Sequence, residues 1–280
     1  SLSDLQTCKT TDNTPDFMGS NKIFKNGFPR PPGTLSNRNN GKVLVIPLEF
    51  NNLPFTTISS SRQIDGKSDF QNLQSVIIET KKAFKELSAG RFNLEIDVLP
   101  ESQWWQVDSN YPFVNQPQVS NISKLIGIAN QIAPDFSYDK YDSYVFLSGD
   151  GEIGQKGLEG LGGAEAGFNY TMNSSKKISA NIILMNGKVN RPYIWVHELN
   201  HSLFAFEDLY LFSGQTIKDS FQGANTPDRW DLMSNAARQE LLMWNKLLMG
   251  WVQDSEVRCI SDQRNTTHYL AEFGETSDPS

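Results

Sequence analysis

Hydrophobic and polar positions along the first half of the chain form blocks that differ in period. Val43 to Ile46 is a short apolar, β-branched run, which is typical of a buried strand. After a polar stretch, apolar side chains recur at helical spacing on one face, and they are Leu73, Val76, Ile77, Phe84 and Leu87. Residues 92–98 then alternate apolar with polar side chains, the period of a half-buried strand. The blocks therefore predict a strand, a helix and a second strand, in that order.

Similar patterns continue to about residue 252. Residues 149–167 are glycine-rich and predict a long surface loop. The remaining blocks predict helices over about 119–132, 192–203 and 236–249, and strands over 143–147 and 181–185. Because strands and helices alternate, the expected fold is a mixed α/β (α+β) domain built on a twisted sheet.

The two ends of the chain differ from this central part. Residues 1–40 are rich in Asn, Gly, Pro and Thr and predict an extended N-terminal arm. We expect one domain over 41–252, followed by a C-terminal segment over 253–280. Cys8 and Cys259 would join the two ends by a disulfide in an oxidising compartment. Two alternatives stay open: a pair of unbonded thiols, or a Cys8 thiolate that occupies a metal site.

Composition excludes some classes of partner. The net charge is −7, whereas binding to nucleic-acid phosphates needs a basic surface. No run reaches the ~20 apolar residues that span a bilayer. We therefore expect a protein that neither crosses a membrane nor binds nucleic acid. We also expect it to be a monomer.

One short segment carries candidate chemistry. His197 and His201 are four residues apart within a predicted helix, so both imidazoles would face one metal ion. Glu198 lies beside them, where a carboxylate can take a proton from a metal-activated water. The chain has three histidines, and chance would place two at this spacing around a glutamate on the order of once in a thousand such sequences. The segment therefore predicts a catalytic zinc site.

A catalytic zinc ion usually has three protein ligands and one open position. The third histidine, His268, lies in a polar tail, so a carboxylate is the expected third ligand. Glu207 and Asp208 follow the second histidine closely. Glu240 would serve if another helix supplied the ligand, but we favour its interpretation as a solvated helix residue.

At these residues a resemblance becomes specific. His197 to His201, with Glu207 to Tyr210 after it, resembles the active-site signature of the immune-inhibitor-A family of metallopeptidases, relatives of the metzincins. Trp230 to Ser234 resembles that family's methionine turn. Three further segments resemble the family in the same order, namely residues 43–50, 87–94 and 244–251. The resemblance spans roughly residues 42–252.

This resemblance implies a metzincin-like catalytic domain with an active-site helix and a C-terminal helical subdomain. It also implies a secreted zinc-dependent endopeptidase that acts on protein or peptide substrates. Glu198 would be the general base, and Met233 an apolar floor beneath the metal. Residues 166–170 would form an edge strand that pairs with an extended substrate.

The chain departs from the family pattern at one position. The family has glycine three residues after the second histidine, where this chain has Phe204, and the Asp-Leu-Tyr motif arrives one residue late. Counting from His201 selects Glu207 as the third ligand, whereas matching the motif selects Asp208, which we favour. A longer helix or a bulged turn would absorb the extra residue.

Three expectations depend on less specific signals. Tyr210 is a candidate hydrogen-bond donor to the oxyanion, although a phenol beside a carboxylate is often structural. Candidate ligands for a structural calcium ion are Asp150, Glu152, Asp219 and Asp228. The alternative function is a catalytically inactive binding module on a peptidase scaffold, and Phe204 in place of glycine favours it.

Overall fold

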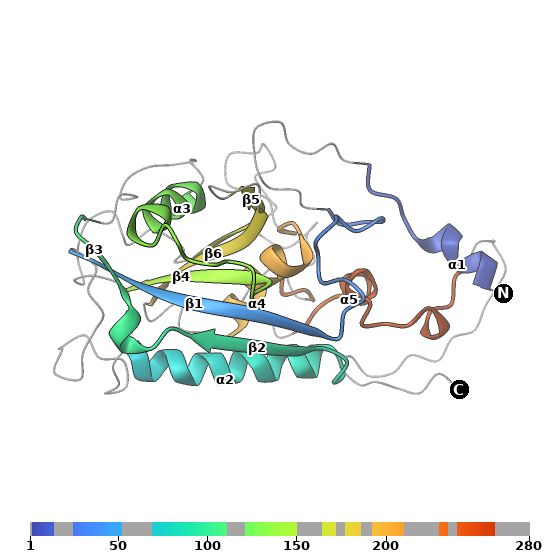
Figure 1. Ribbon diagram of the computed structural model, residues 1–280. Coiled ribbons are helices and arrows are strands. Elements are labelled where there is room, and N and C mark those ends of the chain that lie inside the picture. The colour runs from blue at the N-terminus through green and yellow to red at the C-terminus, as the bar shows by residue number, and fades with distance from the viewer. Residues whose placement is uncertain are drawn as a thin grey trace, which may run out of the picture.

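The computed structural model describes residues 2–13, 25–51, 69–110, 121–149, 164–171, 177–185, 192–209, 230–234 and 240–260. Its strands are β1 (Asn40–Phe50), β2 (Asn93–Val98), β3 (Trp105–Val107), β4 (Ser143–Gly149), β5 (Ala164–Thr171) and β6 (Lys177–Met185). Its helices are α1 (Leu2–Cys8), α2 (Asp69–Leu87), α3 (Asn121–Ile132), α4 (Pro192–Phe204) and α5 (Met243–Met249), with 3-10 turns at Glu101–Gln103 and Asp254–Glu256. Figure 1 shows one sheet with helices packed around it.

The strands form one mostly parallel sheet in the order β2-β1-β4-β6-β5, and β3 pairs with the C-terminal end of β1. All described pairs are parallel except β5 with β6. Parallel neighbours need long crossover connections, which helices usually provide. The expectation of a mixed α/β fold is therefore confirmed.

Both faces of the sheet are covered by helices. Val43 and Val45 of β1 belong to the core cluster that includes side chains of α2 and α4. Leu44 and Ile46 point the other way, into the cluster that includes α3. Successive side chains of a strand point to opposite faces, so a continuous apolar run is what a strand buried on both faces requires.

Some elements differ from the sequence-based expectation. β3 was not predicted, because three residues are too few to show a period. β5 begins at Ala164, inside the stretch expected to be a loop. α5 begins at Met243, and residues 240–242 before it are not helical, so the helix expected from about 236 is wrong at its start. A buried carboxylate, Asp231 Oδ2, accepts a hydrogen bond from Leu242 N just before the helix, at 2.6 Å.

The N-terminal arm is less extended than its composition suggested. Residues 2–8 form the short helix α1, in which Leu5 is buried. Leu35 packs into the main core cluster. The proline-rich stretch between these points therefore belongs to the folded domain and does not simply cross its surface.

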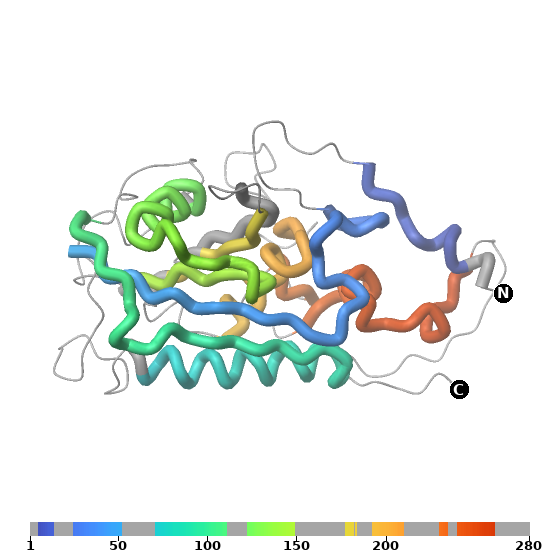
Figure 2. The backbone as a smooth tube through the Cα atoms, viewed as in Figure 1, coloured from blue at the N-terminus to red at the C-terminus, as the bar shows by residue number. Residues whose placement is uncertain are grey.

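The two ends of the described chain lie side by side at one side of the molecule, as Figures 1 and 2 show. Cys8 and Cys259 form a disulfide, and Lys9 Nζ lies 3.0 Å from Asp254 Oδ2. The disulfide was expected, and it leaves no Cys8 thiolate to act as a metal ligand. None of the helices described is both long and apolar enough to cross a bilayer.

Candidate metal centre

The two histidines of the expected metal site lie one turn apart on α4. Pro192 is the first helical residue, a position where its missing N–H is no loss. The rings of His197 and His201 have centroids 4.8 Å apart, and each residue is 5% exposed. Glu198, on the same turn, is partly buried. The helix therefore presents both imidazoles to one shared point.

Backbone carbonyls fix the orientation of both rings. His197 Nδ1 lies 2.9 Å from the Leu232 oxygen, and His201 Nδ1 lies 2.5 Å from the Phe206 oxygen. A carbonyl oxygen only accepts, so each Nδ1 carries the hydrogen and donates it. In the neutral rings, Nε2 then offers a lone pair, and the two Nε2 atoms are 3.2 Å apart. Metal-binding histidines are commonly held in this way.

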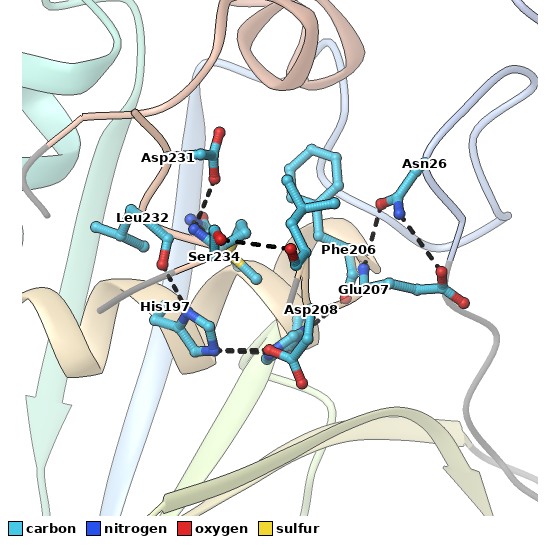
Figure 3. Close-up of polar contacts among 12 residues, drawn as sticks. Asn26, His197, Phe206, Glu207, Asp208, Asp231, Leu232 and Ser234 are labelled. Carbon is cyan, nitrogen blue, oxygen red and sulfur yellow. Dashed lines mark hydrogen bonds and ion pairs between the residues drawn. The ribbon is translucent and has the colours of Figure 1, made fainter. Parts of the chain in front are cut away.

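Asp208 completes the cluster (Figure 3). Its Oδ1 lies 2.9 Å from His197 Nε2 and 3.2 Å from His201 Nε2. One ligand atom from each of the three residues falls within 4.8 Å of the others. Two nitrogen lone pairs and a carboxylate oxygen repel one another unless a cation or protons lie between them. This donor set fits a zinc ion with a fourth position left open.

The backbone between α4 and Asp208 contains a left-handed turn. The helix continues through Phe204, and Ala205 then takes the left-handed conformation with φ 54°. Ala205 N still donates to His201 O at 3.0 Å. A left-handed alanine costs on the order of 1 kcal/mol, which glycine would avoid. The helix therefore ends one residue after the expected Leu203, and the left-handed turn that follows it falls at Ala205.

The other two carboxylate candidates face elsewhere. The Glu207 side chain points toward Asn26, which donates from Nδ2 to Glu207 Oε2 at 3.4 Å (Figure 3). Glu240 Oε1 is 2.7 Å from Lys246 Nζ. Of the three candidates, Asp208 is the one whose carboxylate lies against the histidines.

Met233 lies in a buried turn that contacts α4. Asp231 Oδ1 accepts from Met233 N at 2.6 Å, and Leu209 N donates to Met233 O at 2.9 Å. Asn200, on the helix, has its Nδ2 3.6 Å from Met233 Sδ. The turn is tied to the site twice, because its Leu232 carbonyl also orients His197.

Sequence reasoning placed Asp231 in the segment around Met233 but gave its carboxylate no role. Besides Met233 N, its carboxylate accepts from Leu242 N at 2.6 Å and from Asn245 Nδ2 at 2.9 Å. Burial raises the pKa of Asp231, and these hydrogen bonds oppose that rise. An acidic residue beside a turn is the available signal, but it is too common to be diagnostic.

Several other candidates lie outside the described residues. They are Tyr210, His268 and the four acidic residues considered for calcium, Asp150, Glu152, Asp219 and Asp228. Their places relative to the histidines are therefore not described.

The protein groups of the site favour a proton on His197. Burial lowers the pKa of this imidazole, but the hydrogen bond to Asp208 and the charges of Glu198 and Asp208 outweigh it and raise the pKa to about 9. The pKa of Asp208 is well below its ordinary value: burial would raise it, and the two histidines outweigh that effect. A proton and a metal cation therefore compete for the same lone pair, that of His197 Nε2.

We predict that metal affinity rises with pH up to about 9, the pKa of His197. Below that pKa, displacing one proton costs about tenfold in affinity per pH unit. In the metal-free protein, stabilisation of the fold by His197 is fully present below pH 6.5 and is lost as the pH rises through about 9. Stabilisation of the metal-free protein by Asp208 is present above pH 3.8 and is lost on strong acidification. Chelator competition across this range, corrected for protonation of the chelator, measures the slope, and a flat profile would contradict the prediction.

Comparison of the chain with known protein families and with curated proteins found no match. What the site can do chemically is therefore inferred from its residues and their geometry. Two imidazoles and one carboxylate leave a coordination position for water or substrate, whereas structural zinc sites are usually closed by four Cys or His ligands. The arrangement is that of a candidate catalytic metal centre.

Proposed function

We propose that this chain is a secreted, zinc-dependent endopeptidase. The observation that carries the proposal is the convergence of His197 Nε2, His201 Nε2 and Asp208 Oδ1, which lie 2.9 to 3.2 Å from one another, with Glu198 on the same helical turn. This combination serves hydrolysis, because three ligands leave an open position and the fourth residue supplies a base.

In the proposed mechanism, His197, His201 and Asp208 would hold the metal. Zinc in such a site supplies a Lewis acid that polarises a carbonyl and makes water more acidic. Glu198 accepts the proton of the attacking water and passes it to the leaving amine. The carbonyls of Leu232 and Phe206 keep both imidazoles in the tautomer that binds the metal.

The resemblance to the immune-inhibitor-A metallopeptidases supports the same class. In that comparison Met233 is the methionine beneath the metal, and it contacts Asn200 of the active-site helix. β5 ends the described strand order, runs antiparallel to β6 and packs against α4. An extended peptide that paired with β5 would therefore lie beside the site, and β-strand addition would align it without reading its side chains.

The proposed secretion is inferred from the disulfide, and the proposed monomeric state from the origin of the metal ligands. A disulfide between Cys8 and Cys259 persists in oxidising compartments, which suits a secreted protein. We propose a monomer that acts on protein or peptide substrates, because a complete ligand set comes from one chain. A structural calcium ion stays a proposal from the sequence.

The second candidate is a binding module without catalytic activity. Phe204 favoured this alternative, since a displaced third ligand would weaken metal binding. The extended helix and the turn at Ala205 nevertheless bring Asp208 to both histidines. A module used only for binding would also have no need of Glu198, so we favour the enzyme.

We expect the zinc-loaded protein to hydrolyse an unfolded protein substrate. The activity should be lost on treatment with a zinc chelator and restored by added zinc, since metal-free ligands cannot activate water. Magnesium, which prefers oxygen ligands, is the control and should not restore it. If the protein binds one zinc ion and cleaves nothing, the endopeptidase proposal fails and the binding module replaces it.

A further inference from the structure

The C-terminal end of α4 receives hydrogen bonds from the N-terminal arm. The last carbonyls of a helix have no partner within it and need one from elsewhere. Here Leu35 N donates to Leu203 O at 2.8 Å, and Lys25 N donates to Ala205 O at 2.9 Å. Residues 25–35 thus serve as the cap of the active-site helix, although 170 or so positions separate them from it in the sequence. Figure 2 shows the two segments next to each other.

Arg30 is the side chain at the centre of this contact. Its guanidinium donates to Phe204 O and, at 3.3 Å, to Ala205 O. On the arm it donates to Lys25 O and, at 3.1 Å, to Gly27 O. A cation is also favourable at a helix C-terminus, where the helix dipole is negative. One planar group therefore ties the end of α4 to the arm.

The same guanidinium reaches the segment that carries the third ligand. Arg30 Cζ lies 4.9 Å from the centre of the Phe206 ring, a cation–π contact. The Phe206 carbonyl orients His201, and Asp208 is two residues further on. Arg30 thus contacts three consecutive residues, 204–206, which run from the last residue of α4 toward the aspartate.

We propose that Arg30 is a positioning residue for the metal centre, which holds residues 204–206 so that Asp208 and His201 meet the same ion. The inference rests on the metal site of the proposed function. Arg30 remains charged at neutral pH, because burial lowers its pKa only to about 10, against a raising effect of Asp12. Replacing Arg30 leaves all three metal ligands in the chain but loosens residues 204–206, which set the position of Asp208.

The test is zinc affinity, measured by chelator competition on the full chain. Arg30→Met keeps an apolar side chain near Phe206 and removes every donor. We expect affinity about 10- to 100-fold weaker, the range typical of groups that orient metal ligands. Arg30→Lys, which keeps the charge and part of the hydrogen bonding, should lie between this variant and the wild type. The matched control is Arg38→Met, because Arg38 pairs with Asp142 at 2.8 Å and does not contact residues 204–206 in any described interaction.

Thermal unfolding of each variant, with and without zinc, separates positioning from simple stabilisation. A metal that binds only the folded state stabilises it more the tighter it binds, with the logarithm of its affinity, so a positioning role shrinks the zinc-induced rise in melting temperature. Wild-type zinc affinity in both Arg30 variants, or equal destabilisation with and without zinc, would overturn the inference and leave Arg30 as a helix cap alone. If Arg30→Met does not fold, wild-type affinity in Arg30→Lys alone overturns it. If the wild-type chain itself binds no zinc, the proposed function fails first, and the inference fails with it.

Discussion

Replacement of Glu198 by glutamine is expected to lower the rate of peptide hydrolysis by several orders of magnitude while zinc stays bound. Glutamine has nearly the same size and cannot accept a proton, so the variant loses the base and keeps the helix. Loss of a general base costs about 10²–10⁴-fold in rate. Initial rates on an unfolded protein substrate, together with the zinc content of the purified variant, measure both halves of this prediction.

Glu207→Gln is the matched control for this experiment. Glu207 is close in sequence to the site, but its carboxylate faces Asn26, and a glutamine oxygen can accept the same bond. We expect near wild-type rates from it. Substantial hydrolysis by zinc-loaded Glu198→Gln would show that another group takes the proton, and the assigned mechanism would be wrong.

The second large effect is expected from Asp208→Asn, which should greatly weaken zinc binding. Asparagine keeps the shape of the side chain and removes the charge that offsets the buried metal cation. The loss of affinity should exceed the roughly 10- to 100-fold that follows changes in outer-shell groups, because a direct ligand is altered. Chelator competition gives the affinity, and hydrolysis should fall with it.

Glu207→Gln is again the matched control, and its zinc affinity is measured in the same chelator competition as that of Asp208→Asn. The distances of 2.9 and 3.2 Å from Asp208 Oδ1 to the two Nε2 atoms lead us to expect that the Glu207 variant binds zinc normally. The reverse result, with zinc lost from Glu207→Gln and kept by Asp208→Asn, would mean that the segment after α4 is shifted by one residue from the arrangement described.

Much of the fold and half of the candidate site could be predicted from local patterns. The period of apolar residues predicted β1, α2 and β2, because side-chain direction along a strand or helix depends on spacing alone. The same rule places His197 and His201 on one face of α4, since residues four apart are neighbours on any helix. The shortest elements were missed because a period needs several residues to appear.

The third ligand could not be predicted in this way. Glu207 and Asp208 are adjacent acids, and their side chains point in different directions once the backbone between them and α4 is set. That backbone depends on the left-handed turn at Ala205 and on contacts from Arg30, which lies far away in the sequence. Two acids at neighbouring positions therefore left the choice open.

The sequence by itself determined the strand and helix periods, the histidine pair and the glutamate beside it, because each depends on residues only a few positions apart. The tertiary structure decided the rest: which acid faces the histidines, which carbonyls orient their rings, and how Asp231 joins the turn at Met233 to the start of α5. These depend on hydrogen bonds between distant segments, and the sequence carries no periodic signal for a partner that only folding brings near.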